Sequence, residues 1–369
     1  MLIVLSSKLT TISAVKMTLM SAHLILILVL FIYPILVWGL FRQVWVSDGR
    51  IRGLLLKLSL SLASLLFLFG GFEYYFYNHV AFSDAFGQTK MHNNWRAKYG
   101  SVPSNSLGLR DEEPVLSGKP ALYVVGDSFT AGHGINNFQD RYANVLETLL
   151  QQQWDLILLA KGGWATSKQL EIYSEISNRR DEQDGVLIWQ YYINDIEESG
   201  EAIGISRPSI YLGAPQYLKP IVDNFHFANF LYWGVFRTAY AKELGQQYLA
   251  YFQECYSNEQ VWEHHRERLQ QVVDLQHRNE LKTKGGTLPN RKLIVIIYPN
   301  LRDIAVTRRM SDKVARFFQS QGVSVVNMAD LLSEYSAEEI TVNSLDGHAN
   351  EMVNRLLAEY LYRHHFAAK

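Results

Sequence analysis

The stretch ALYVVGDSFTAG, residues 121–132, decides the fold of this 369-residue chain. A continuous apolar run ends at Gly126, and Asp127 and Ser128 follow at once. Such a run is typical of a strand buried in a parallel sheet, and the glycines predict a tight turn into a helix. Ser128 would stand there as an exposed nucleophile, beside free backbone N–H groups and the positive end of the helix dipole. A serine that only caps a helix would show the same pattern.

The pattern of a short apolar run followed by a helical stretch repeats along the chain. We expect strands at residues 121–125, 154–160, 185–193, 292–298 and 323–328, and helices at 141–152, 167–177, 307–319 and 350–364. This alternation predicts an α/β protein, with a three-layer α/β/α domain over residues 120–369 and about five parallel strands. Residues 197–286 break the pattern, and we interpret them as a helical insertion beside the site. Its aromatic side chains would pack a small core or contact substrate, and packing is the favoured interpretation.

Further polar residues and glycines follow the predicted strands, at the sheet edge where open parallel sheets bind ligands. Gly163 follows the second strand and would let a backbone N–H approach a ligand closely. Asn194 follows the third strand, where its amide would donate to a developing oxyanion. Asp346 and His348 stand just before the last helix and would form an oriented general base. Each of these residues taken alone also has a plain structural explanation.

Taken together and in this order, these residues resemble the SGNH hydrolases, also called GDSL-type esterases. The resemblance covers the chain from about residue 105 to its end, apart from the insertion. The matching residues are, in chain order, GDSF at residues 126–129, Gly163, Asn194 with Asp195, and Asp346 with His348.

The resemblance implies a flavodoxin-like SGNH-hydrolase domain and a serine esterase or O-acyltransferase that needs no cofactor and no metal. Ser128 would attack an acyl carbonyl, His348 would take the serine proton, and Asp346 would orient the imidazole. The backbone N–H groups of Ser128 and Gly163, with the amide of Asn194, would form the oxyanion hole. The spacing of Asp346 departs from the family, which commonly places this aspartate one residue earlier.

Two long apolar runs precede the domain. Residues 17–41 contain no Asp, Glu, Lys or Arg, and residues 54–72 contain only Lys57 and lead into an aromatic cluster at 72–77. Each run is long enough to cross the ~30 Å core of a bilayer. We therefore expect a membrane anchor over residues 1–80, with transmembrane helices at about 17–41 and 54–77, and a linker and lead-in over residues 81–119. A cleaved signal peptide is the alternative for the first run.

The placement of basic residues predicts the orientation of this anchor. Arg42, Arg50, Arg52 and Lys57 lie in or beside the connector between the two runs, which the positive-inside rule places in the cytoplasm. Both termini and the large domain would then face away from the cytoplasm, at a bacterial inner membrane. Cys255 is the single cysteine, so an intrachain disulfide is excluded.

Charge and location narrow the class of substrate. Lys and Arg number 35 against 36 Asp and Glu, a balance that predicts no nucleic-acid partner. The expected substrate is an acyl ester on carbohydrate, with acetyl groups on envelope or exported polysaccharide as the first choice, and polysaccharide-synthesis partners are not identified. The sequence does not decide between a hydrolase and a transferase. A lipid esterase or thioesterase and a non-catalytic glycan-binding or assembly subunit are the alternative functions.

Overall fold

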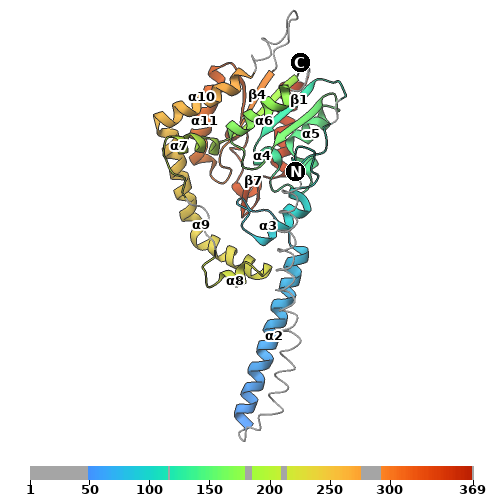
Figure 1. Cartoon of the computed structure of the whole chain (residues 1–369), viewed down its shortest axis with the longest axis vertical. Helices are drawn as coiled ribbons and strands as arrows, with labels where there is room; N and C mark the ends of the chain where they lie inside the picture. The colour runs from blue at the N-terminus through green and yellow to red at the C-terminus, as the bar shows by residue number, and fades with distance from the viewer. Residues whose placement is uncertain (1–48, 115–116, 179–184, 209–213, 276–291, 368–369) are drawn as a thin grey trace, which may run out of the picture. The chain divides into compact units, whose positions relative to one another are not determined.

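The computed structural model describes residues 49–114, 117–178, 185–208, 214–275 and 292–367 (Figure 1). The chain divides into two compact units. Unit 1 comprises Met1–Ala81, Thr89–Asn94 and Leu212–Ala239, and unit 2 comprises Phe82–Gln88, Trp95–Tyr211 and Tyr240–Lys369. The predicted transmembrane helix at residues 17–41 lies outside the described residues, so it stays a prediction.

Unit 2 is built on a five-stranded parallel sheet, as the alternating pattern predicts. The strands are β1 (Ala121–Gly126), β2 (Asp155–Ala160), β3 (Gly185–Tyr192), β4 (Lys292–Tyr298) and β5 (Ser324–Asn327). Their order in the sheet is β2-β1-β3-β4-β5. In register, Gly126 pairs with Ala160 and Val125 with Trp189, so the carboxyl ends of β1, β2 and β3 meet at one edge. That edge positions the candidate site.

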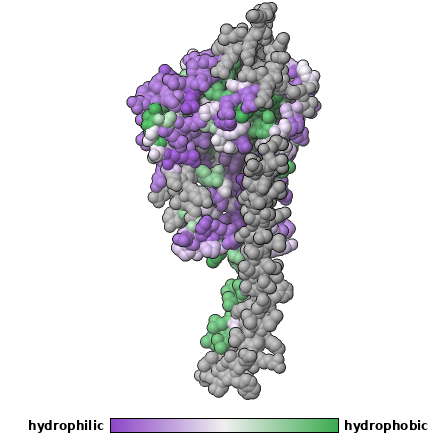
Figure 2. Space-filling model, in the orientation of Figure 1, coloured by the Kyte–Doolittle hydropathy of each residue, from purple (hydrophilic) through white to green (hydrophobic). Residues whose placement is uncertain are grey.

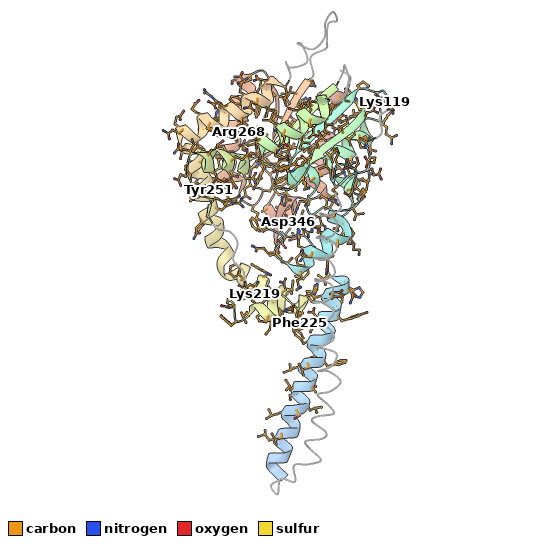
Figure 3. The ribbon with its side chains drawn as sticks, viewed as in Figure 1. Lys119, Lys219, Phe225, Tyr251, Arg268 and Asp346 are labelled. Carbon is orange, nitrogen blue, oxygen red and sulfur yellow. The ribbon has the colours of Figure 1, made fainter. Side chains whose placement is uncertain are left out.

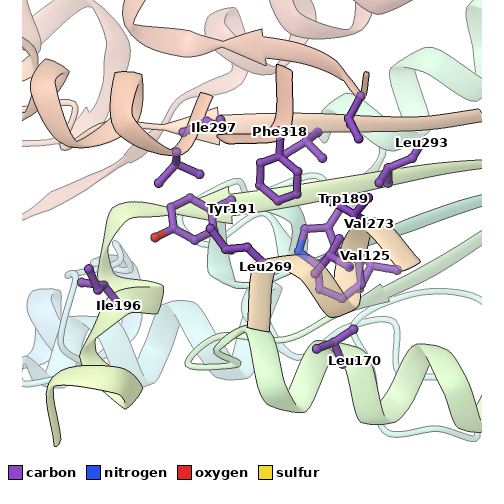
Figure 4. Packing of buried hydrophobic residues seen from close by; sticks show 14 of the residues in the cluster. Val125, Leu170, Trp189, Tyr191, Ile196, Leu269, Val273, Leu293, Ile297 and Phe318 are labelled. Atoms are coloured by element: carbon purple, nitrogen blue, oxygen red, sulfur yellow. The ribbon is translucent and has the colours of Figure 1, made fainter. Parts of the chain in front are cut away.

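Both faces of the sheet are buried under helices. Tyr123 and Val125 of β1 face one apolar cluster, and Leu122 and Val124 face the other. The first cluster is closed by α6 (Thr166–Asn178), α10 (Glu259–Asp274) and α11 (Ile304–Ser320), part of which Figure 4 shows around Trp189. The second is closed by α5 (Tyr142–Leu149), α12 (Met328–Leu331) and α14 (Glu351–Leu361). The result is the predicted three-layer α/β/α arrangement.

Shorter elements complete unit 2. They are η1 (Arg96–Gly100), α4 (Ser128–Ala131), η2 (Phe138–Asp140), η3 (Ile193–Ile196), α7 (Glu197–Ala202), α13 (Ala337–Ile340) and η4 (Tyr362–Phe366). A two-stranded antiparallel hairpin, β6 (Thr341–Asn343) and β7 (Asp346–Ala349), was not expected from the sequence.

Helix α10 corrects the interpretation of residues 197–286 as an insertion throughout. Its buried residues include Val261, Leu269 and Val273, which recur on one face of the helix and pack into the cluster on the sheet. An apolar stripe of this kind covers a core, and α10 is therefore one of the helices of the α/β/α layer.

Unit 1 contains α2 (Gly49–His79), most of α3 (Lys90–Trp95), α8 (Lys219–Val222) and the start of α9 (His226–Ser257). Gly53–His79 of α2 is long and apolar enough to cross a membrane by length and composition, and it is the one such helix among the described residues. Figure 2 shows hydrophobic side chains on the part of α2 that is coloured. The amide of Asn94 donates to the carbonyl oxygens of Tyr77 and Val80, so it satisfies the carboxyl end of α2.

Candidate active site

Ser128 begins α4 and is separated from β1 only by Asp127, as the opening stretch predicts. A side chain on Gly126 would place Cβ 2.2 Å from Oγ1 of Thr130 and 2.5 Å from Oε1 of Gln190, so only glycine fits at this turn. The helix after Ser128 is shorter than expected: it ends at Gly132, whose φ of +71° closes it after one turn. A four-residue helix has little macrodipole. The expectation that a helix dipole assists Ser128 is therefore wrong.

Three of the predicted residues meet in a hydrogen-bonded chain. Nε2 of His348 lies 2.8 Å from Oγ of Ser128, and Nδ1 of His348 lies 2.5 Å from Oδ1 of Asp346. Because a carboxylate only accepts, Nδ1 carries the proton and Nε2 offers its lone pair to the serine hydroxyl. Asp346 is fully buried, whereas His348 and Ser128 are half-buried. This is the geometry of a nucleophile, a general base and an orienting carboxylate.

The hairpin explains the unusual spacing of Asp346 and His348. Both lie on β7, labelled at Asp346 in Figure 3, and alternate residues of a strand point to the same side. The turn that leads into β7 is fixed by Oδ1 of Asn343, which accepts from the backbone N–H groups of Leu345 and Asp346 at 2.7 and 3.0 Å. Between the two, Gly347 leaves room for Arg302, since a Cβ there would lie 2.8 Å from Nε of Arg302.

The imidazole of His348 is held by packing and by charge. Its ring lies 4.9 Å from the ring of Phe129 and 4.4 Å from that of His133, between centroids. Burial alone would lower the pKa of His348, but the charge and the hydrogen bond of Asp346 outweigh burial, and the charge of Asp127 adds to them, so the pKa is raised. Asp346 is buried too, yet the imidazole holds its pKa well below the usual range. Burial raises the pKa of Asp127 to about 6.

The sequence analysis missed a group of residues behind Asp346. Ser83, which is buried, donates its hydroxyl to Oδ2 of Asp346, and its backbone oxygen accepts from the Asn343 amide at 3.0 Å. Nε2 of His133 lies 3.0 Å from the carbonyl oxygen of Asp84 and 3.4 Å from Oδ2 of Asp346. Residues 82–88, here called the strap, thus form part of the site although the sequence predicted a linker there. Ser83 and Asp346 are 263 residues apart, so no local pattern could have joined them.

The three predicted oxyanion donors lie at the carboxyl ends of β1, β2 and β3. Gly163 has a φ of +79°, in the left-handed region that favours glycine, and a Cβ there would meet no atom within 4 Å. The preceding Gly162 lies against the nucleophile, since its Cβ would stand 3.7 Å from Cβ of Ser128. Asn194 is half-buried in η3, directly after β3. The roles of Gly163 and Asn194 stay predictions.

His133, Asp346 and His348 also form a set of potential metal ligands, whose nitrogen and oxygen atoms lie within 4.8 Å of one another. Both oxygens of Asp346 already accept hydrogen bonds, and both nitrogens of His348 are engaged by Asp346 and Ser128. The two imidazole rings are tilted by only 31° at 4.4 Å, so their in-plane lone pairs do not converge on one point. These three residues are therefore better explained as members of the hydrogen-bonded chain than as ligands of a metal ion.

Comparisons with known proteins gave likenesses only among solved structures. No protein-family model matches the chain, and no curated protein matches it. The lipase Lip_vut3 from a goat rumen metagenome is 14% identical, with 68% of this chain and 99% of that chain covered and a TM-score of 0.42.

Two other solved structures are similar at the same level. A member of the lipolytic G-D-S-L family from Veillonella parvula is 10% identical, with 67% and 99% covered and a TM-score of 0.37. A carbohydrate acetylesterase family member from Sinorhizobium meliloti is 13% identical, with 66% and 96% covered and a TM-score of 0.36. These identities and TM-scores decide nothing about activity, so the functional conclusion rests on the contacts of Ser128.

Proposed function

We propose that this protein is a membrane-anchored serine esterase or O-acyltransferase of the SGNH type. The observation that carries the proposal is the contact of 2.8 Å between Oγ of Ser128 and Nε2 of His348, with Asp346 hydrogen-bonded behind the imidazole. The serine hydroxyl attacks an acyl carbonyl while His348 takes its proton, and the imidazolium then protonates the leaving alcohol. Water or a sugar hydroxyl releases the acyl group from Ser128 by the reverse path, with His348 again as the base.

The oxyanion of the tetrahedral intermediate is assigned to the backbone N–H groups of Ser128 and Gly163 and to the side-chain amide of Asn194. The meeting of three strand ends supports this assignment, because it brings the three donors to the sheet edge that holds the nucleophile. Donors that are fixed before the reaction stabilise the developing charge without reorganisation.

Replacing Asn194 with alanine is expected to lower kcat by roughly 10²–10³-fold, or ~2.7–4 kcal/mol, with little change in KM. The reason is that this amide would bind the oxyanion only in the transition state. Steady-state hydrolysis of an aryl acetate measures both constants. The matched control is Asn258→Ala, which removes the side-chain cap of α10 and should cost about 1 kcal/mol of stability without lowering kcat. A wild-type kcat in folded Asn194→Ala would remove this residue from the oxyanion hole.

Ser83 is proposed as a positioning residue for Asp346. We expect Ser83→Ala to lower kcat about tenfold, because a hydrogen bond to a buried charge is lost and the carboxylate no longer has a fixed direction. In the Asp346→Asn background the same change should have no further effect, since the two residues act through one contact.

The matched control for Ser83 is Ser311→Ala, which removes another buried hydroxyl, bonded to the backbone oxygen of Arg308 away from the site. It should leave kcat unchanged. Equal losses from Ser83→Ala in the wild-type and Asp346→Asn backgrounds would mean that Ser83 serves the fold and not the carboxylate.

The proposed substrate is an acetyl ester of envelope or exported polysaccharide, and the proposed setting is the outer side of the inner membrane. The apolar length of Gly53–His79 and the basic residues before it, Arg50 and Arg52, support this orientation. A rate that is highest for acetyl and falls with acyl-chain length would support the carbohydrate ester, and the opposite trend would favour a lipid ester.

A reporter fusion tests the proposed orientation of the membrane anchor. Alkaline phosphatase fused after Lys90 should be active in cells, because this point would lie outside the cytoplasm. A reporter that works only in the cytoplasm, active at the same point, would contradict the orientation and the envelope substrate with it.

A further inference from the structure

The start of α9 buries two polar side chains together with Trp233, and it exposes large apolar side chains on the opposite face. The buried positions include His226 and Asn229, which are 3% and 4% exposed. The opposite face carries Leu231 at 48% and Val235 at 70% exposure. No Asp, Glu, Lys or Arg occurs between Asp223 and Arg237. A surface helix in water carries charged or polar side chains on its outer face instead.

The inward polar groups are satisfied within unit 1. The carboxylate of Glu73, which is fully buried on α2, accepts from the backbone N–H groups of His226 and Phe227 at 2.8 Å each. It also lies 3.1 Å from Nδ1 of His226. Oδ1 of Asn229 accepts from the backbone N–H of Lys90 at 3.0 Å. A charge inside an apolar helix with all its bonds made internally is what a bilayer environment requires.

Aromatic contacts place this segment beside the apolar length of α2. The ring pairs that join them include Phe69 with Phe225, Phe72 with Phe227, and Phe76 with Phe230, with centroids 5.5, 4.7 and 4.7 Å apart. The distance from Phe69 to His79, the last residue of α2, is about 15 Å along the helix axis, at 1.5 Å per residue. Figure 3 labels Phe225 close to α2, at the turn between α8 and α9. Phe225, Phe227 and Phe230 therefore pack against α2.

We propose that residues 214–236, here called the elbow, are a second membrane-contacting element whose partner is the lipid bilayer. The inference rests on α2 crossing the membrane, and it goes beyond the proposed chemistry. Besides Leu231 and Val235, the elbow exposes Tyr217 at 79% and Ile221 at 50%. Tyrosine and aliphatic side chains of this kind bury readily at the boundary of headgroups and acyl chains. Continuity with the exposed apolar surface of α2 favours lipid over a second protein chain as the occupant.

Site-directed fluorescence in the full chain tests the elbow. Cys255 is fully buried and its burial raises the pKa of its thiol to about 11, so the wild-type chain offers little reactive thiolate. Leu231→Cys and Val235→Cys, each labelled with a nitrobenzoxadiazole dye, would be placed in phosphatidylcholine–phosphatidylglycerol nanodiscs. Leu65→Cys on α2, 64% exposed, is the positive control, and Tyr335→Cys in unit 2, 39% exposed, is the aqueous control.

The expected result is that lipids with a shallow spin label quench more than about half of the fluorescence at Leu231 and Val235, and almost none at Tyr335. The proposal would be overturned if aqueous iodide quenched the dyes at Leu231 and Val235 as strongly as it quenches the dye at Tyr335. Dyes shielded from iodide but not quenched by lipid would also overturn it, because a second copy or another protein would then cover the face. Leu65 lies near the middle of the span Gly53–His79, so its dye is tested with lipids that carry the spin label deep in the acyl chain, and absence of quenching there would mean that the anchor itself is wrong.

Discussion

Replacing Ser128 with alanine is expected to abolish esterase activity, with a loss of kcat on the order of 10⁶-fold, because the members of such a triad act as a unit. The hydroxyl is the group that forms the acyl-enzyme, and no other side chain takes its place at the hydrogen bond with His348. Hydrolysis of an aryl acetate by the full chain measures the loss. The fold should stay intact, because alanine keeps Cβ and Ser128 is only half-buried.

The control for this change is Ser336→Ala, which removes an exposed serine hydroxyl that caps α13 and should leave kcat at the wild-type level. The thermal midpoint of each variant checks that the chain is folded. A folded Ser128→Ala protein that keeps wild-type turnover would contradict the proposed mechanism.

Replacing Asp346 with asparagine is expected to lower kcat by about 10⁴-fold, the scale seen when the aspartate that orients a catalytic imidazole is made neutral. Asp346 fixes the tautomer of His348 by accepting from Nδ1 at 2.5 Å and stabilises the imidazolium that forms during attack. An amide of the same shape still fits the buried position but carries no charge.

The change at Asp346 also has a pH signature. Activity requires neutral His348, so kcat/KM rises with pH through the pKa of this imidazole in the free enzyme. The anion of Asp346 holds that pKa up against burial. Its loss therefore favours the neutral imidazole, and the acid limb of the kcat/KM profile should move to lower pH. Loss of Asn194 should leave the limb in place. An unchanged rate and an unmoved limb in Asp346→Asn would mean that His348 works with another partner.

The sheet was predictable because its strands are continuous apolar runs that end in glycine or polar residues. The predicted strands at residues 121–125 and 292–298 agree with β1 and β4 to within one residue. Ser128, Gly163 and Asn194 could be placed on this frame because parallel strands end at one edge. The hairpin that carries Asp346 was missed, since β6 and β7 are too short to show a period of two.

The remaining parts depend on contacts between distant segments. Ser83 follows an apolar helix in a stretch without any motif, and only the folded chain brings it to Asp346. Glu73 follows the second apolar run in the sequence, and only its bonds to the start of α9 show that it is buried. The charged outer face of α10 outweighed its apolar stripe in the sequence interpretation. In each case the surroundings of the residue or helix depend on tertiary contacts with distant segments, which local composition does not show.

Mass spectrometry of the full chain after reaction with a fluorophosphonate ester shows whether Ser128 is an activated nucleophile. Ser128 is the proposed nucleophile, and its activation needs the lone pair of His348 at 2.8 Å. We expect one phosphonyl adduct, mapped to Ser128, in the wild-type protein, and almost none after the same exposure in Ser128→Ala or His348→Ala. An adduct on a different residue, or equal labelling of Ser128 in the presence and absence of His348, would contradict this expectation.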